Sequence, residues 1–424
     1  MGVRLFAWAC SAESRSATFN PGTPWLDSSG ASINAHGGGI IEQNGTYYWF
    51  GEKRTGSASD GVSVYSSRDL YTWQNLGLAL AVDADHAGSD IARGCVIERP
   101  KVLFNKKTGK YVLWFHLELK GQGYGAARAA VAVSDMIAGP YRFVKSFRPN
   151  GNMVRDMTVY QDDDGSAYII YAARDNYDMR LAQLTDDYQS VTEHDVMIFS
   201  EHREAPAIFK NKGTYYLITS ACTGWAPNQA RLHIANSIFG PRKDAGDPMR
   251  GLNSELTFGG QSTFIPPAPG HDGHFVFMAD QWIPRDVGNS TQLWLPIRFE
   301  NGSPVIEWKD SWDLSYFEQP GLDTAAMKPA SNGSRTLSIF ASPEEMKDVI
   351  VSSATIHAAD EGRPSCVYAG IRRSIFQNGS RCTSKGGSEP HVSWFTFRWT
   401  HARRGTGMRG VLRCNLRIPV HVGT

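Results

Sequence analysis

Three acidic residues hold the same place in a repeated sequence pattern. Glu98, Asp156 and Glu204 each open an apolar run, and a glycine nine to eleven residues later begins a second run. A carboxylic acid can protonate a leaving oxygen while a second group orients or deprotonates a water, or acts as nucleophile. Burial and mutual repulsion raise the pKa of one such acid towards neutrality. This pattern therefore indicates the chemistry of glycoside hydrolysis.

Each acid also has a basic neighbour, which offers a purely structural alternative. Arg99 and Arg155 flank Glu98 and Asp156, and Arg203 precedes Glu204. Simple ion pairing could explain any one of these acids. Three acids at one repeat position favour a shared site over three separate pairs.

The repeat that carries the acids occurs five times. A glycine opens a strand-like run such as Gly-Thr-Tyr-Tyr-Trp-Phe, and a polar residue nine to twelve positions earlier opens an apolar run. The five polar residues are His36, Glu98, Asp156, Glu204 and Gln261. Long repeats of β-strands with glycine-rich turns are typical of propellers, in which neighbouring blades bury each other's faces. We predict an all-β, five-bladed β-propeller over residues 20–316.

A propeller would bring the polar residues together. If the first strand of each blade is innermost, all five converge on one end of the channel, and the next strand ends on the same face because it is antiparallel. The residues expected at this pit from the second strands and their loops are Glu52, Tyr124, Asn176, Thr223, Trp225 and Trp282.

The amino-acid composition limits the classes of binding partner that we expect. The net charge of +1 gives no reason to expect nucleic acid or a membrane as partner, and no stretch approaches the roughly 20 apolar residues of a membrane span. The six cysteines show no metal-ligand spacing. We expect no metal, no cofactor and a monomer.

Two features suggest export. Residues 1–19 resemble a truncated signal peptide, with one basic residue before a short apolar run. Asn-x-Ser/Thr sequons, which fit a secreted glycoprotein, occur at Asn44, Asn289, Asn301, Asn332 and Asn378. We expect an extracellular protein.

The repeat stops after residue 316. Residues 317–424 form an unassigned C-terminal extension whose last part is rich in Arg, Ser and Gly. We expect no β-sandwich pattern there and a poorly ordered tail, and we assign it no function.

Residues 20–316 resemble glycoside hydrolase family 43, and more closely its exo-β-1,3-galactanase branch. The similarity rests on Asn34-Ala-His-Gly-Gly-Gly39, Trp49-Phe-Gly-Glu-Lys53, Glu98-Arg-Pro-Lys101, Arg155-Asp-Met157, Arg203-Glu-Ala-Pro206 and Gly260-Gln-Ser-Thr263. These motifs are specific together and weak singly. The resemblance implies a five-bladed propeller and an inverting mechanism.

The resemblance also implies roles. Glu204 would be the general acid and Asp156 would modulate its pKa. Where the family has an Asp base in the first blade, this chain has His36, as in the galactanase branch, and Gln261 would then hold the attacking water. Glu98 would either bind sugar hydroxyls or serve as the base. Glu52, Tyr124, Asn176 and Thr223 would bind the sugar, with His36 among the substrate contacts and Trp225 and Trp282 as stacking platforms.

The resulting hypothesis is an exo-acting hydrolase that releases galactose from the non-reducing end of β-1,3-galactan, the arabinogalactan backbone. Two alternatives stay open. One is the α-L-arabinofuranosidase or β-xylosidase activity of the same family, against which His36 and Gln261 argue. The other is a non-catalytic carbohydrate-binding propeller that lost its base.

Overall fold

The computed structural model describes residues 17–56, 58–319 and 322, together with the backbone of four strands nearer the C-terminus. The chain divides into two compact units, Met1–Met327 and Lys328–Thr424. Within the described residues, no helix is long and apolar enough to cross a membrane.

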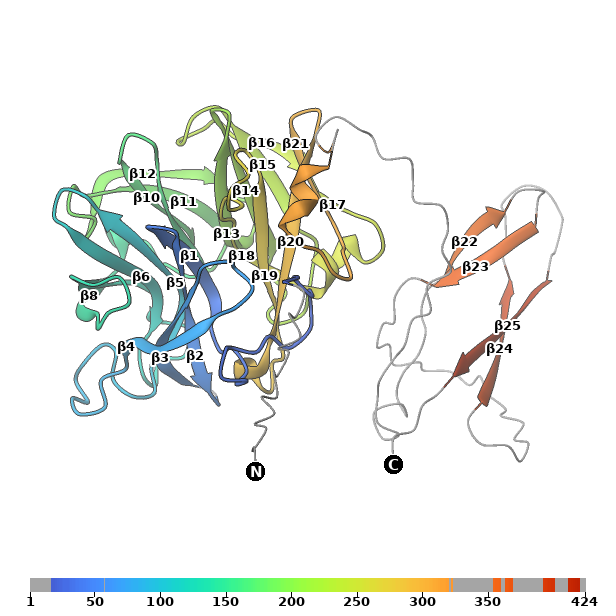
Figure 1. The fold of residues 1–424 in the computed structure, drawn as a ribbon, viewed down its shortest axis with the longest axis horizontal. Helices are drawn as coiled ribbons and strands as arrows, with labels where there is room; N and C mark the ends of the chain where they lie inside the picture. The colour runs from blue at the N-terminus through green and yellow to red at the C-terminus, as the bar shows by residue number, and fades with distance from the viewer. Residues whose placement is uncertain are drawn as a thin grey trace, which may run out of the picture. The chain divides into compact units, whose positions relative to one another are not determined.

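The first unit contains five sheets, four antiparallel and one mixed, that follow one another along the chain (Figure 1). Four of them have four strands in sequence order. They are β1 (His36–Gln43), β2 (Thr46–Thr55), β3 (Ala58–Ser67) and β4 (Gln74–Ala81); β5 (Val96–Asn105), β6 (Lys110–Glu118), β7 (Arg128–Ser134) and β8 (Arg142–Phe147); β9 (Met157–Gln161), β10 (Ala167–Ala173), β11 (Asp178–Leu184) and β12 (Val191–Phe199); and β13 (Arg203–Asn211), β14 (Thr214–Ala221), β15 (Arg231–Ala235) and β16 (Lys243–Gly246).

The fifth sheet has an extra edge strand. It comprises β17 (Met249–Arg250), β18 (Gln261–Phe264), β19 (Phe275–Gln281), β20 (Thr291–Glu300) and β21 (Ser303–Glu307), and β17 pairs in parallel with β21. Short 3-10 turns interrupt the loops at η1 (Pro149–Gly151), η2 (Ser254–Gly259), η3 (Val287–Asn289) and η4 (Leu314–Glu318).

The first strands of the sheets lie at the centre. They contact one another in a closed ring, β1–β5–β9–β13–β18 and back to β1. The five-bladed propeller predicted from the repeat is therefore confirmed, with each first strand innermost. The second strands are buried on both faces, as in β6, whose interior residues are all buried. Apolar and aromatic residues fit there because each blade packs against its neighbours.

The two ends of the propeller meet through backbone pairing and aromatic packing. The Phe19 amide donates to the Trp312 carbonyl at 2.7 Å, and the reverse hydrogen bond is 3.1 Å long. The Phe19 ring stacks on Trp312 with centroids 4.4 Å apart. Trp49 and Trp294 extend this buried cluster between the first and fifth blades. Most tryptophans of this region therefore serve blade packing.

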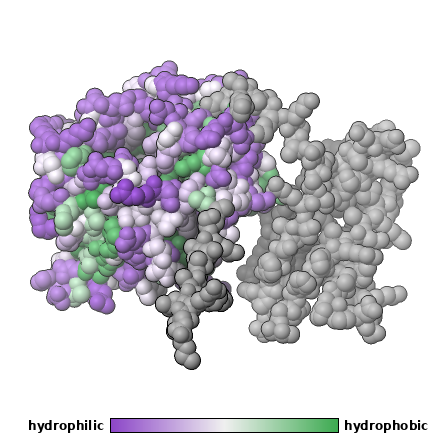
Figure 2. Space-filling view, viewed as in Figure 1, coloured by the Kyte–Doolittle hydropathy of each residue, from purple (hydrophilic) through white to green (hydrophobic). Residues whose placement is uncertain are grey.

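The surface of the propeller is mainly polar. Figure 2 shows a face dominated by hydrophilic residues, with separate apolar patches between them. This mixture is ordinary for a folded domain, since polar groups do not cover the whole surface.

The second unit contains β structure. Its described strands are β22 (Ala354–Ala359), β23 (Arg363–Tyr368), β24 (Val392–Thr400) and β25 (Val411–Pro419). They pair antiparallel as β22–β23 and β24–β25. These strands lie in the C-terminal extension that the sequence left unassigned. Apolar residues in β24, which reads Val-Ser-Trp-Phe-Thr-Phe-Arg-Trp-Thr, are typical of a strand.

Candidate active site

A pit of about 340 Å³ opens at the end of the propeller where the first strands begin. Its walls come from all five blades. The lining residues are Glu52, Glu98, Arg99, Tyr124, Arg155, Asp156, Asn176, His202, Glu204, Cys222, Gly224, Trp225, Gln261 and Trp282. Nine of the eleven residues predicted for the site lie among them.

β-Bulges aim the inner side chains into this pit. The pairing register shifts directly after the polar residue in three first strands, between His36 and Gly39, Glu98 and Lys101, and Glu204 and Ala207. In those three strands the residue after the polar one is left-handed, with φ of 57° at Gly37, 55° at Arg99 and 52° at Ala205. In the fifth blade the shift comes one residue later, between Ser262 and Phe264. A bulge bends its strand and re-aims side chains. Glu98 and its neighbour Arg99 can therefore both face the channel.

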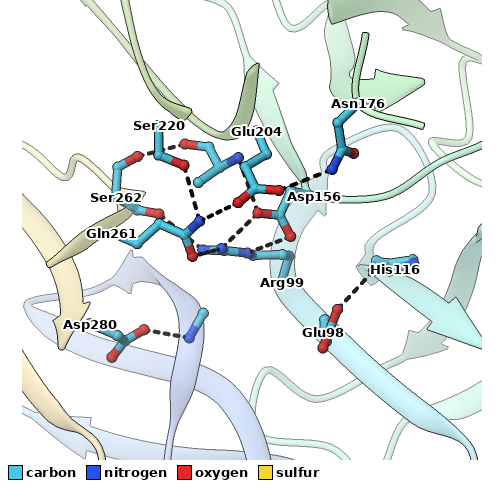
Figure 3. A network of polar contacts seen from close by, with 12 residues as sticks. Glu98, Arg99, His116, Asp156, Asn176, Glu204, Ser220, Gln261, Ser262 and Asp280 are labelled. Carbon is cyan, nitrogen blue, oxygen red and sulfur yellow. Dashed lines mark hydrogen bonds and ion pairs between the residues drawn. The ribbon is translucent and has the colours of Figure 1, made fainter. Parts of the chain in front are cut away.

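Glu204 lies at the centre of a hydrogen-bonded group (Figure 3). Its Oε2 accepts from Asn176 Nδ2 at 3.0 Å, and its Oε1 accepts from Gln261 Nε2 at 2.9 Å. Burial, reinforced by the negative charge of Asp156, raises the pKa of Glu204 to about 8. The carboxyl group is therefore protonated at neutral pH and can donate a proton.

Asp156 is held as an ion pair beside Glu204. Arg99 donates to both of its oxygens, from Nε at 3.0 Å and from Nη2 at 2.7 Å. The Ala205 amide donates to Asp156 Oδ2 at 3.1 Å. Ion pairing with a basic residue, the structural alternative for these acids, therefore occurs at Asp156, but its partner is an arginine of another blade. Its own neighbour Arg155 pairs with Asp175 at 2.8 Å instead.

The Gln261 side chain is hydrogen-bonded on both ends. Its amide nitrogen donates to Glu204 and to Ser220 Oγ at 3.0 Å. Its oxygen accepts from Arg99 Nη2 at 2.6 Å and from Trp282 Nε1 at 2.8 Å. Four contacts satisfy the full capacity of an amide. Gln261 therefore links the acid, the Arg99–Asp156 pair and the rim tryptophan in a fixed geometry.

The other end of the pit is built around Glu98 and Arg54. Glu98 Oε1 accepts from Arg54 Nη2 at 2.5 Å and from the Tyr124 hydroxyl at 2.6 Å. Although burial alone would raise the pKa of Glu98, the hydrogen bond from His116 and the charge of Arg54 hold it well below its ordinary value. Arg54 Nε also lies 3.1 Å from Glu52 Oε2. Burial raises the pKa of Glu52 to about 7, so of the two acids Glu52 and Glu98 it is Glu52 that takes up a proton more readily.

Behind Glu98 lies a fully buried histidine. His116 Nδ1 is 3.1 Å from Glu98 Oε2, and His116 Nε2 is 2.8 Å from Glu118 Oε1. Burial alone would lower the pKa of His116, but its two carboxylate partners raise it to about 9. Glu118 is fixed in turn by the Ala127 amide at 3.0 Å. His116 therefore fixes the position of the Glu98 carboxylate, and Figure 3 shows the contact between them.

Two aromatic residues close one side of the rim. Trp225 and Trp282 meet edge to face, with centroids 5.3 Å apart. The Arg54 guanidinium lies 6.0 Å from the Trp225 ring, and that of Arg99 lies 5.8 Å from the Trp282 ring. The indoles thus cover the cationic side of the pit.

Two predicted site residues are corrected. His36 was expected among the substrate contacts, but it is fully buried behind the pit. Its Nδ1 lies 3.4 Å from Asp280 Oδ1 and its Nε2 lies 3.2 Å from the Gly288 carbonyl, so the ring braces the first blade against the fifth. Thr223 is not among the residues that line the pit, and its hydroxyl donates to the Ala226 carbonyl at 2.6 Å.

Several residues of the site were not predicted. Arg99, His202 and Cys222 line the pit, and Arg54 and His116 contact Glu98. Arg54 carried a usable signal, since it lies two residues after Glu52 on the same strand and therefore on the same face. Arg99 was considered only as a neutralising neighbour of Glu98, because nothing in the sequence of that segment predicts the bulge that turns its side chain into the channel.

One group of side chains could in principle hold a cation. Single donor atoms of Glu98, His116 and Asp156 lie within 4.8 Å of one another. These donors already accept from or donate to protein groups, and the arginines at 54 and 99 lie beside them. We assign the cluster to hydrogen bonding.

A larger cavity of about 610 Å³ opens on other residues of the first strands. Its walls are mainly apolar, with contributions from Val102, Val159, Ile208 and Phe264. The carboxylate chemistry described above belongs to the smaller pit.

Comparison with known proteins identifies the family. The model for glycosyl hydrolases family 43 matches residues 36–283. A solved family 43 β-1,3-galactosidase in complex with galactodeoxynojirimycin is 47% identical over 70% of this chain and 100% of its own, with a TM-score of 0.68. A comparison with curated proteins returned no match.

Two exo-β-1,3-galactanases are also similar. The enzyme of Phanerochaete chrysosporium, solved as a Glu-to-Gln variant with β-1,3-galactotriose, is 35% identical over 70% of this chain and 68% of its own, with a TM-score of 0.65. The Clostridium thermocellum enzyme is 36% identical over 70% of this chain and 66% of its own, with a TM-score of 0.64. Another structure of the fungal enzyme aligns over 95% of this chain at 27% identity, and so reaches into the second unit. This chain is a glycoside hydrolase and belongs to glycosyl hydrolases family 43.

Proposed function

We propose that this protein releases galactose from the non-reducing end of β-1,3-galactan by an inverting, exo-acting mechanism. The observation that carries the proposal is Glu204, a carboxyl group protonated at neutral pH between Asn176 and Gln261. The similarity to solved β-1,3-galactosidases and exo-β-1,3-galactanases supports galactan as substrate.

The proton would pass from Glu204 to the glycosidic oxygen. Asp156 supplies negative charge that keeps Glu204 protonated, while its own oxygens are occupied by Arg99. A carboxylate held in that way is unsuited to attack carbon, which favours direct attack by water and therefore inversion. The proton that the attacking water loses would pass to solvent in the pit, and Glu204 would take up a proton from solvent before the next turnover. The rigid Gln261 amide would set the position of that water through the residues it links.

Glu98 fits a sugar-binding role better than the role of base. Three donors from Arg54, Tyr124 and His116 hold its pKa low. A carboxylate with a low pKa is a weak base, yet it accepts hydrogen bonds from sugar hydroxyls well. Glu98 and Glu52 would therefore recognise the terminal sugar at their end of the pit, and this role fits exo action.

We further propose that the protein is secreted and glycosylated. The sequons at Asn44, Asn289 and Asn301 lie on exposed residues of the propeller, where a glycan could be attached. Comparison of the chain purified from culture medium and from cells, before and after glycan removal, tests this proposal.

The activity is tested with unbranched β-1,3-galactan, with arabinan, xylan and aryl glycosides in parallel. Galactose should be the sole early product, and nuclear magnetic resonance should show the α-anomer first. Release of arabinose or xylose would point instead to another activity of the family. Binding without turnover would support a non-catalytic propeller.

Replacement of the acid tests the mechanism. Glu204→Gln keeps the shape of the side chain but cannot donate the proton, so kcat/KM should fall ~10²–10⁴-fold. The fold should persist, as circular dichroism would show. Activity within tenfold of wild type would remove Glu204 from the acid role.

A further inference from the structure

A layered stack of side chains ends at the wall of the pit next to Glu204. The His202 ring, which lines the pit, lies parallel to Tyr177 with centroids 4.4 Å apart and planes 13° apart. The Arg174 guanidinium lies 5.2 Å from the Tyr177 ring. Two hydrogen bonds of 2.7 Å hold Arg174 to Asp178. The pit therefore has a flat, supported ring in a wall that the proposed mechanism does not use.

The stack is tied to the acid through the backbone. The His202 amide donates to the Tyr177 carbonyl at 3.2 Å, which joins the loop after β10 to the start of β13. Tyr177 follows Asn176, which donates to Glu204, and His202 lies two residues before Glu204. The platform and the proton donor are thus held in one local framework.

The position of the acid tells which part of the substrate passes this stack. Glu204 must contact the glycosidic oxygen, which joins the terminal sugar to the second sugar. Glu52, Glu98 and Arg54 lie together on the first two blades. Trp225, in the loop after β14 of the fourth blade, and Trp282, directly after β19 of the fifth blade, meet edge to face at the rim. His202 and Tyr177 lie on the third and fourth blades next to the acid, where the second sugar can pass over them.

A free acceptor lies on the same path. Among the residues that the structure describes, Asn176 Oδ1 is buried and has no hydrogen-bond partner. A buried acceptor left unpaired is costly, and a ligand hydroxyl would satisfy it. Tyr177 is 49% exposed, so the stack is open to an approaching ligand.

We infer that His202, supported by Tyr177, forms the subsite for the second sugar, the leaving group. The ring face would pack against the C–H groups on one face of that galactosyl residue, and Asn176 Oδ1 would accept one of its hydroxyls. This inference rests on the proposed galactanase function. It assigns His202 to binding of the leaving group and leaves the terminal sugar to Glu52 and Glu98.

The test measures binding without turnover. In the Glu204→Gln background, calorimetry compares galactose and β-1,3-galactotriose with and without His202→Ala. Loss of the platform should weaken galactotriose binding about 3- to 10-fold, the scale of a ring-stacking contact. Galactose should bind unchanged. Tyr177→Leu, which removes the support but keeps His202, should give a smaller loss of the same kind.

A matched control exists on the third blade. His194 stacks on Phe239 with centroids 3.8 Å apart and planes 16° apart, and it does not line the pit. His194→Ala should leave both affinities unchanged. His202→Phe keeps a flat ring and should restore most of the galactotriose affinity.

The outcomes separate the two proposals. Equal galactotriose affinity with and without His202, or an equal loss for galactose and galactotriose, would overturn the subsite. If the Glu204→Gln protein with intact His202 binds neither ligand, the galactanase function itself is wrong.

Discussion

Asp156→Asn should make the pH dependence of catalysis more acidic. The substitution removes a negative charge beside Glu204 and releases the positive charge of Arg99 from its partner. Both changes favour the ionised form of Glu204, so its pKa falls. Because the active form carries the proton, activity is present below this pKa and is lost as pH rises through it.

The size of the effect follows from the charges. For carboxylates on the order of 5 Å apart and an effective dielectric constant of about 20, Coulomb's law gives about 3 kcal/mol. That energy moves a pKa by about 2, which takes Glu204 from about 8 to about 6. At pH 7.5 its protonated fraction would drop about 25-fold, whereas at pH 5 it would hardly change.

The assay is kcat/KM on β-1,3-galactotriose from pH 5 to pH 9. The ratio of variant to wild type should fall about 25-fold more at pH 7.5 than at pH 5. If the substitution also disturbs the positioning of the site, kcat/KM falls by the same factor at both pH values. That factor cancels when the variant-to-wild-type ratio at pH 7.5 is divided by the ratio at pH 5. Asp163→Asn is a control, since it removes an exposed charge that pairs with Lys210 outside the pit. An alkaline limb that stays within half a pH unit of wild type would refute the assignment of Asp156.

Two further predictions concern stability. The pKa of His116 rises from 6.5 to about 9 in the folded state. Its ionisation should therefore contribute about 3 kcal/mol to the free energy of unfolding. This contribution should be complete below pH 6.5 and should disappear as the pH rises through 9. Denaturant unfolding at several pH values should show this slope in the wild type and a flatter profile in His116→Gln; parallel profiles would contradict it. Gly38→Ala would place a Cβ 1.9 Å from the Phe50 carbonyl oxygen on the paired strand, and should lower the free energy of unfolding by about 3 kcal/mol. Gly88→Ala, with open space around it, is the control, and an equal loss in both would count against the packing argument.

The acids and the repeat could be predicted from the sequence because they follow the periodicity of the strands. Glu98, Asp156 and Glu204 hold one position in successive copies, and a propeller brings equivalent positions together. Asn176 and Trp282 followed from antiparallel pairing, because the second strand of a blade ends on the face where the first begins.

Other features depended on contacts between blades. His36 holds the repeat position of the acids, yet it braces Asp280 and Gly288 far along the chain. His116 sits on β6 among apolar residues, and only packing against Glu98 and Glu118 makes it an imidazolium.

The sequence by itself determined the fold class, the blade count and the acids of the pit, because these follow from local hydrophobic patterning and its repetition. Tertiary structure supplied the physical reason that Glu204 carries the proton. A pKa reflects burial and neighbouring charge, and Glu204, Asp156 and Glu98 acquire their neighbours from different blades. The stack of His202 on Tyr177 has the same origin, since it joins two loops that the sequence keeps 25 positions apart.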